Sequence, residues 1–170
     1  MIKINEEMQV IFKRVGDWNA LRYSRKYNQQ LTSKLLNEEH QEYFDAATQV
    51  DKLDALCDTC YVAMGGLWKI GVDNVFVHND ADLFGNALCE DKSNIITLKA
   101  IIAKVVVLAQ TELNISPQTF IRALSIVCDA NDSKIVPQSL VASNVKANIN
   151  KGTSFVPPET ELSKLLAEEL

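Results

Sequence analysis

Acidic side chains are concentrated in one short stretch of the sequence, between residues 38 and 58. The only cation in this stretch is Lys52, and its carboxylates are Glu38, Glu39, Glu42, Asp45, Asp51, Asp54 and Asp58. A solvated helix face normally carries charges of both signs, because like charges one helical turn apart repel each other. A divalent cation relieves such crowding, and ligation by carboxylate oxygens suits Mg²⁺ or Mn²⁺. The stretch therefore predicts a metal site.

The spacing of these acidic residues predicts that they face one another across a helical hairpin. Glu38 and Glu42 are one helical turn apart, as are Asp54 and Asp58, so each pair lies on one helix face. In an antiparallel hairpin, residues equidistant from the turn lie at the same level. Glu42 with Asp54 and Glu39 with Asp58 both have their midpoint near residue 48. We therefore expect these four carboxylates to converge between the two helices.

The rest of the sequence predicts the helices that would position this site. Apolar residues recur at steps of three and four, and strand-like alternation is not evident. We expect an all-α fold, a helical bundle with an extended C-terminal arm, with helices at roughly 5–15, 28–46, 50–70, 80–90, 94–113 and 117–131. Gly71 is expected to end a helix, and Asn94 and Ser116 are expected to be N-caps, with Pro117 in the first helical position.

Composition limits the chain to one main domain. With 170 residues, of which 47% are hydrophobic, it can bury one sizeable core, which we assign to residues 1–134. Residues 135–170 are polar and punctuated by proline, and we expect them to form an arm that packs on this domain or on a neighbouring subunit. The net charge of −5 argues against long nucleic acids and anionic membranes as partners.

Hydropathy gives an expectation about location. No secretory signal is visible at the start of the sequence, and the most apolar stretch, 95–108, is interrupted by Lys99 and Lys104. That stretch is too short to span a bilayer. We therefore expect a cytoplasmic protein without a membrane partner.

Two motifs in the acidic stretch resemble the all-α NTP pyrophosphohydrolase superfamily. They are LLNEEHQEY at 35–43 and LDALCDTCYV at 53–62, and they are most similar to MazG-like and phosphoribosyl-ATP pyrophosphohydrolase-like proteins. Those proteins carry an E-E-x-x-E helix followed by a second acidic helix. The resemblance covers roughly residues 18–75, and CDANDSK at 128–134 resembles a late Asn-x-x-Lys element of some members. It implies a Mg²⁺-dependent enzyme that hydrolyses a nucleoside triphosphate, or a related nucleotide such as phosphoribosyl-ATP, to the monophosphate and pyrophosphate.

Carried over by position, the resemblance also implies roles for individual residues. The metal ligands would be Glu39, Glu42, Asp54 and Asp58. Glu38 would be a further ligand or the base that activates water. The family's second motif is E-x-x-D, but Ala55 stands three residues before Asp58, and Asp51 with Asp54 would restore that spacing, so the ligands on the second helix stay open. The candidate substrate contacts are Asn131, Lys134, Asn19, Arg22 and Lys34.

Ordinary structural roles compete with these assignments. Asn131 and Lys134 fit a helix cap and a cation at a helix C-terminus equally well. Core packing is the favoured role for Trp18 and for the cysteines Cys57, Cys60, Cys89 and Cys128. The whole protein also fits a non-catalytic helical module that binds nucleotide or a partner protein, or a structural protein with a solvated acidic face. Family members build the site from two or more subunits, which implies a homodimer or homotetramer.

Overall fold

The computed structural model describes residues 2–75, 92–134 and 155–169, and these ranges contain helices and no strands. The helices are α1 (Ile2–Ala20), α2 (Gln29–Asp45), α3 (Gln49–Ile70), α5 (Lys92–Glu112), α6 (Pro117–Asp132) and α7 (Glu159–Glu168). The expected all-α fold is therefore confirmed. The helix expected at 80–90 lies outside the described residues.

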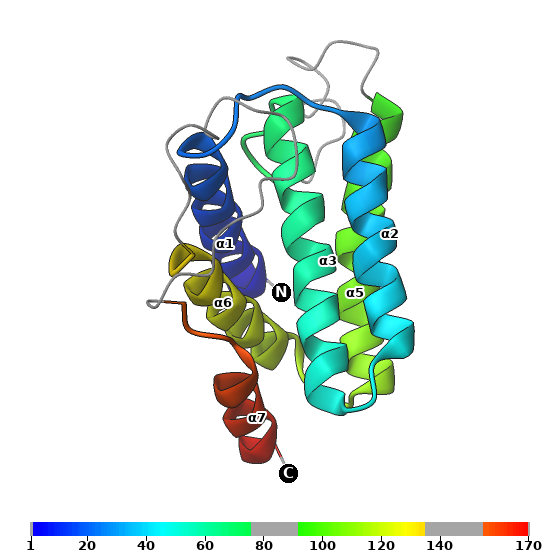
Figure 1. The fold of residues 1–170 in the computed structure, drawn as a ribbon, viewed down its shortest axis with the longest axis vertical. Coiled ribbons are helices and arrows are strands. Elements are labelled where there is room, and N and C mark those ends of the chain that lie inside the picture. The colour runs from blue at the N-terminus through cyan, green and yellow to red at the C-terminus, as the bar shows by residue number, and fades with distance from the viewer. Residues whose placement is uncertain (1, 76–91, 135–154, 170) are drawn as a thin grey trace.

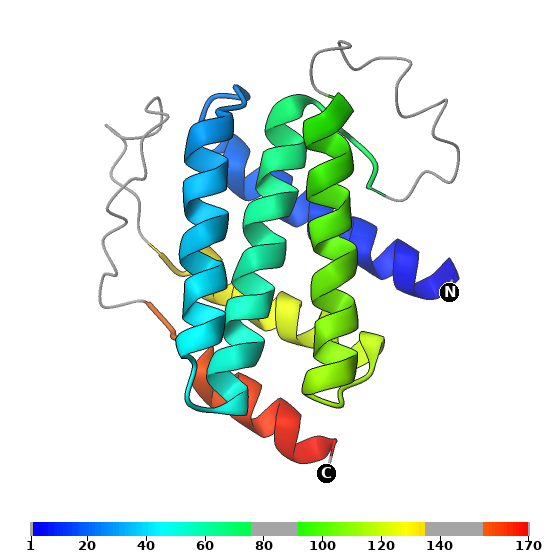
Figure 2. The same ribbon diagram turned by 90° about the vertical axis from the view of Figure 1, so that its right-hand side faces the viewer.

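Helix α3 is the centre of the molecule and contacts each of the other helices in the described ranges. Helices α2, α3 and α5 lie side by side, and α1 and α6 cross one face of this layer (Figures 1 and 2). The side chains of Leu53, Met64 and Leu67 on α3 are completely buried in the resulting core. A residue on α3 is therefore placed by contacts with its neighbours α2 and α5 and with α1 and α6 across one face.

Local signals in the sequence explain where the helices begin and end. Thr48 and the side chain of Asp51 form a capping box at the start of α3, and Gly71 ends that helix with a φ of 103°, a backbone conformation that favours glycine. Ser116 caps α6 with Pro117 in its first turn, as expected. The prediction that Asn94 is an N-cap is wrong, because α5 already includes Lys92 and Asn94 lies inside it.

The hairpin of α2 and α3 has the predicted antiparallel register. A Cβ atom added to Gly66 would lie 3.3 Å from the Thr32 methyl carbon, and the Lys52 ammonium lies 5.7 Å from the centre of the Tyr43 ring. Both contacts join residues that are centred near residue 48. The predicted pairing of α2 with α3 is therefore confirmed.

The C-terminal helix α7 packs on the same domain. Its Leu162 is completely buried and Leu165 nearly so, against α3 and α6. Residues 135–154 of the expected arm lie outside the described residues. Core packing is confirmed for Cys57, Cys60 and Cys128, which are buried free thiols, and Cys89 lies outside the described residues.

Helix α5 is more apolar than the other helices of the described ranges. One stretch of it, Ser93–Glu112, is long and apolar enough to cross a membrane by length and composition alone, with 28% of the window buried. The apolar stretch is longer than the range 95–108 that the sequence suggested, so the expectation that it is too short to span a bilayer is wrong by length. This is weak evidence for a membrane segment, because core helices of soluble proteins pass the same test.

Candidate active site

Asp54 is a carboxylate that the fold holds in an unfavourable environment. Its Oδ1 atom is buried and has no hydrogen-bond partner. The pKa of Asp54 is raised to about 7, first by burial and then by the negative charges of Asp58 and Glu159. The positive charge of Lys134 acts in the opposite direction. A carboxylate with an unpaired buried oxygen and negative neighbours fits a site that receives a cation.

The charges that act on Asp54 come from elements far apart in the sequence. Asp58 lies one turn further along α3, and Glu42, which also raises the Asp54 pKa, lies on α2. Lys134 follows the end of α6, and Glu159 is the first residue of α7. The fold therefore brings the acidic hairpin and the late Asn-x-x-Lys element into electrostatic contact.

The four proposed metal ligands are not drawn together around one point. In the part of the chain that the structure describes, no three His, Cys, Asp or Glu side chains are placed to hold a metal ion. Glu42 is exposed, and Glu39, Asp54 and Asp58 are half-buried. Repulsion between like charges favours such separation when no cation lies between them. The donor chemistry nevertheless fits Mg²⁺, since all donors are carboxylate oxygens and one of them lacks a partner.

Asp51 is occupied in another way. Its side chain accepts a hydrogen bond from the backbone N–H of Thr48 at 3.2 Å, and the Thr48 hydroxyl accepts one from the backbone N–H of Asp51. This capping box fixes the first turn of α3. On the second helix it favours Asp54 and Asp58, rather than Asp51, as the pair available for a cation.

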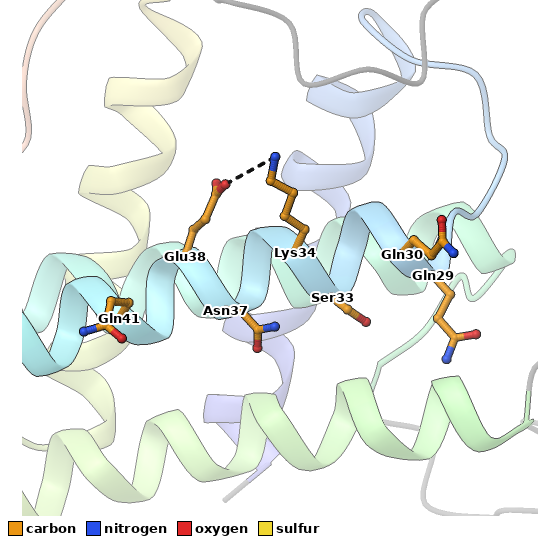
Figure 3. Close-up of a pocket in the computed structure, with 7 residues that line it drawn as sticks. All are labelled: Gln29, Gln30, Ser33, Lys34, Asn37, Glu38 and Gln41. Carbon is orange, nitrogen blue, oxygen red and sulfur yellow. Dashed lines mark ion pairs between the residues drawn. The ribbon is translucent and has the colours of Figure 1, made fainter.

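Glu38, the candidate base, lies at the rim of a shallow pocket on α2. Its Oε1 atom is 3.9 Å from the Lys34 ammonium. The pocket measures about 680 Å³, and its other lining residues are Gln29, Gln30, Ser33, Asn37 and Gln41. Figure 3 shows Glu38 and Lys34 pointing away from α5, whereas Ser33 and Asn37 point toward the side on which α5 lies.

The Asn-x-x-Lys element forms a hydrogen-bonded unit at the end of α6. The Lys134 ammonium donates to the Asn131 side-chain oxygen at 2.6 Å, and the Asn131 side chain is buried. The Asn131 carbonyl accepts a hydrogen bond from the Trp18 indole at 3.0 Å, which ties this unit to α1. Trp18 is buried, so its expected core packing is confirmed.

The two other candidate substrate contacts from the α1 region differ from each other. Asn19 is buried and donates to the Val15 carbonyl at 2.8 Å, and its side chain fits against Gly65 of α3. Arg22 lies over the Trp18 ring, 4.2 Å from its centre, and donates to the Trp18 carbonyl. Asn19 therefore packs between helices, while Arg22 lies at the edge of the site.

Sequence reasoning missed two residues of this region. Tyr61 is buried with a hydroxyl that has no hydrogen-bond partner, and the charges of Asp58, Asp132 and Arg22 act on it. Its position seven residues after Asp54 places it on the same face of α3, which was the available signal. Glu159 had no local signal, because its proximity to Asp54 arises only when α7 docks.

Comparison with known proteins finds a family match over the part of the chain that includes the acidic hairpin. Residues 5–83, a little under half of the chain, match the family model of phosphoribosyl-ATP pyrophosphohydrolase. No curated protein and no solved structure matches the chain.

Proposed function

We propose that the protein is a Mg²⁺-dependent pyrophosphohydrolase of the all-α NTP pyrophosphohydrolase type, because residues 5–83 match the family model of phosphoribosyl-ATP pyrophosphohydrolase. Water attacks the α-phosphate of a nucleoside triphosphate, or of a related nucleotide such as phosphoribosyl-ATP, and pyrophosphate leaves. The other product is the monophosphate. The observation that carries the proposal is the buried, unpaired carboxylate oxygen of Asp54 within the matched region.

The residues proposed to hold Mg²⁺, or Mn²⁺ in its place, lie on both helices of the hairpin. They are Glu39, Glu42, Asp54 and Asp58. When bound, the metal supplies positive charge to the phosphate oxygens and to the leaving pyrophosphate. Two rigid helices position such ligands better than loops do.

Other side chains are proposed to handle water and substrate. Glu38 is the candidate base, and its Oε1 atom lies 3.9 Å from the Lys34 ammonium. Lys134, held by Asn131, supplies a fixed positive charge beside Asp54 for the phosphates. Lys34 and Arg22 are the remaining cations proposed to contact substrate. Asn19 was also predicted to contact substrate. Because it packs against Gly65 of α3, we propose that it holds α1 against α3 instead.

The test is pyrophosphate release from a panel of NTPs, dNTPs and phosphoribosyl-ATP with Mg²⁺ and Mn²⁺. At least one nucleotide is expected to turn over, and Glu42→Ala is expected to lower kcat/KM by at least about a hundredfold, because it removes a proposed metal ligand. Glu42 is exposed, so circular dichroism and the melting temperature should stay close to those of the wild type.

Asp45→Ala is the matched control. Asp45 is also an exposed acid of α2, but its carboxylate is engaged by the Gln41 side chain. Its replacement should leave turnover unchanged. Full activity in Glu42→Ala, or no pyrophosphate release from any nucleotide, would contradict the proposed function.

The second candidate is a non-catalytic module that binds a nucleotide or a partner protein. It is supported by the separation of the acidic side chains in the described ranges, where no three of them are placed to hold a metal ion. Calorimetry that detects nucleotide binding without turnover at any Mg²⁺ concentration would favour it. In either case we propose a cytoplasmic protein that forms a homodimer or homotetramer. Light scattering tests the oligomeric state.

A further inference from the structure

Three buried side-chain polar atoms in the described part of the chain lack a hydrogen-bond partner. They are Arg22 Nε, Asp54 Oδ1 and Tyr61 Oη. All three belong to one region. Arg22 lies over the Trp18 ring, the Tyr61 ring meets the same ring edge-on at 5.7 Å between centres, and the charge of Asp58 acts on both Tyr61 and Asp54.

Such atoms are costly to a folded protein, and their concentration calls for a physical reason. A buried polar group without a partner loses its hydrogen bonds to water and gains none in return. Other buried polar side chains of this core are paired: the Thr59 hydroxyl donates to the Ala55 carbonyl, and the Asn19 amide donates to the Val15 carbonyl. The unpaired atoms therefore do not reflect a generally loose interior.

The hydroxyl of Tyr61 is the most informative of the three. The side chain is only 8% exposed, and its ring packs edge-on against Trp18. A phenylalanine would make the same ring contacts without burying an unpaired oxygen. The fold thus gains nothing from the hydroxyl, which points to a partner that arrives with a ligand.

Arg22 is held in a way that leaves one donor available. Two of its guanidinium nitrogens donate to the carbonyls of Trp18 at 3.2 Å and of Lys134 at 3.4 Å, so Nε–H has a fixed position and no acceptor. Arginine carries its positive charge at all physiological pH values. The charge of Arg22 acts on the Tyr61 hydroxyl, and both side chains pack on Trp18. A cationic donor and a phenol hydroxyl in one region match an anionic oxygen.

We propose that Tyr61 Oη and Arg22 Nε–H form a donor pair that binds a phosphate oxygen of the nucleotide beside Asp54, which makes Tyr61 a substrate-binding residue. This inference rests on the proposed function, since the nucleotide is the proposed substrate. Each of the three atoms exposes less than 1 Å² in this structure, so the surrounding side chains must move apart when the nucleotide enters.

The test is Tyr61→Phe, with binding of α,β-methylene ATP in Mg²⁺ measured by calorimetry and thermal melting measured without nucleotide. A hydrogen bond to a charged group corresponds to a loss of roughly ten- to a hundredfold in affinity. The melting temperature without nucleotide should rise, because the variant no longer buries an unpaired hydroxyl. Weaker binding by a more stable protein is a combination that a structural role does not produce.

Tyr43→Phe is the matched control. The Tyr43 hydroxyl donates to the Glu112 carboxylate at 2.5 Å, on the part of α2 that meets α5 rather than α1. Its loss should leave nucleotide affinity unchanged and should not raise the melting temperature. The control thus separates the removal of a paired hydroxyl from the removal of an unpaired one.

The outcomes separate this inference from the proposed function. Equal nucleotide affinity of Tyr61→Phe and the wild type would overturn the inference, as would a lower melting temperature of the variant without nucleotide, which would show that a bound water already pairs the hydroxyl. Nucleotide binding that depends on Tyr61 but is not accompanied by pyrophosphate release would overturn the proposed function and support the inference.

Discussion

Replacing Asp54 by asparagine is expected to stabilise the metal-free protein and to remove its stabilisation by Mg²⁺. The substitution keeps the shape of the side chain and removes a negative charge that is buried, has an unpaired oxygen and lies near Asp58 and Glu159. The ionised carboxylate is disfavoured in this position, since the pKa of Asp54 is raised to about 7, and each pKa unit corresponds to about 1.4 kcal/mol. We therefore expect the free energy of unfolding to rise by about 1–3 kcal/mol, which is roughly 2–12 °C in Tm for a chain of this length.

Addition of Mg²⁺ should reverse the order of the two proteins. A ligand that binds only the folded state stabilises it by about 2.7 kcal/mol at a hundred times its Kd. The wild type gains this energy through Asp54, whereas the variant lacks the charged ligand. At high Mg²⁺ concentration the wild type should therefore melt at or above the temperature of the variant.

Differential scanning fluorimetry across a Mg²⁺ titration, started in a chelator, measures both effects. Asp45→Asn is the control, because Asp45 is exposed and hydrogen-bonded to Gln41, and it should behave like the wild type throughout. The reasoning is refuted if Asp54→Asn melts below the wild type in the chelator. An equal Mg²⁺ shift in both proteins would refute the assignment of Asp54 as a ligand.

The remaining predictions concern the packing that positions the site. Gly16→Ala should destabilise by about 1–3 kcal/mol in urea unfolding, because the new Cβ would lie 2.7 Å from Cδ1 of the Trp68 ring; an unchanged midpoint would show that Trp68 moves freely. Leu162→Ala should cost about 2–5 kcal/mol, since this completely buried side chain anchors α7 beside α3. A loss below about 1 kcal/mol would mean that α7 contributes little to the fold.

The hairpin was predictable from the sequence because its determinants are local. Periodic apolar residues define α2 and α3, and Gly71 with its left-handed backbone ends α3 where the pattern stops. The register followed from the turn between the helices, and the contact of Thr32 with Gly66 confirms it. Ser116 and Pro117 marked the start of α6 by the same kind of local chemistry.

The surroundings of Asp54 were not predictable in the same way. Glu159 is more than a hundred residues away in sequence, and only the docking of α7 through Leu162 and Leu165 brings its charge near Asp54. Asn94 illustrates the opposite error. Its side chain suits a cap, but α5 begins before it, so a favourable residue type did not fix the helix boundary.

Variants of Asp54 and Tyr61 can distinguish the proposed enzyme from a structural protein with an acidic face. In the structural case, the charge of Asp54 and the hydroxyl of Tyr61 have no function. Asp54→Asn then removes a disfavoured charge, Tyr61→Phe removes an unpaired hydroxyl, and neither change loses anything. In the enzyme, the same changes also stabilise, because the cost is the same, but the first loses Mg²⁺ binding and the second loses nucleotide affinity. Stability alone therefore cannot separate the two cases. Ligand binding by variants that are more stable than the wild type can, because a weakened site in a strengthened fold excludes damage to the structure as the cause.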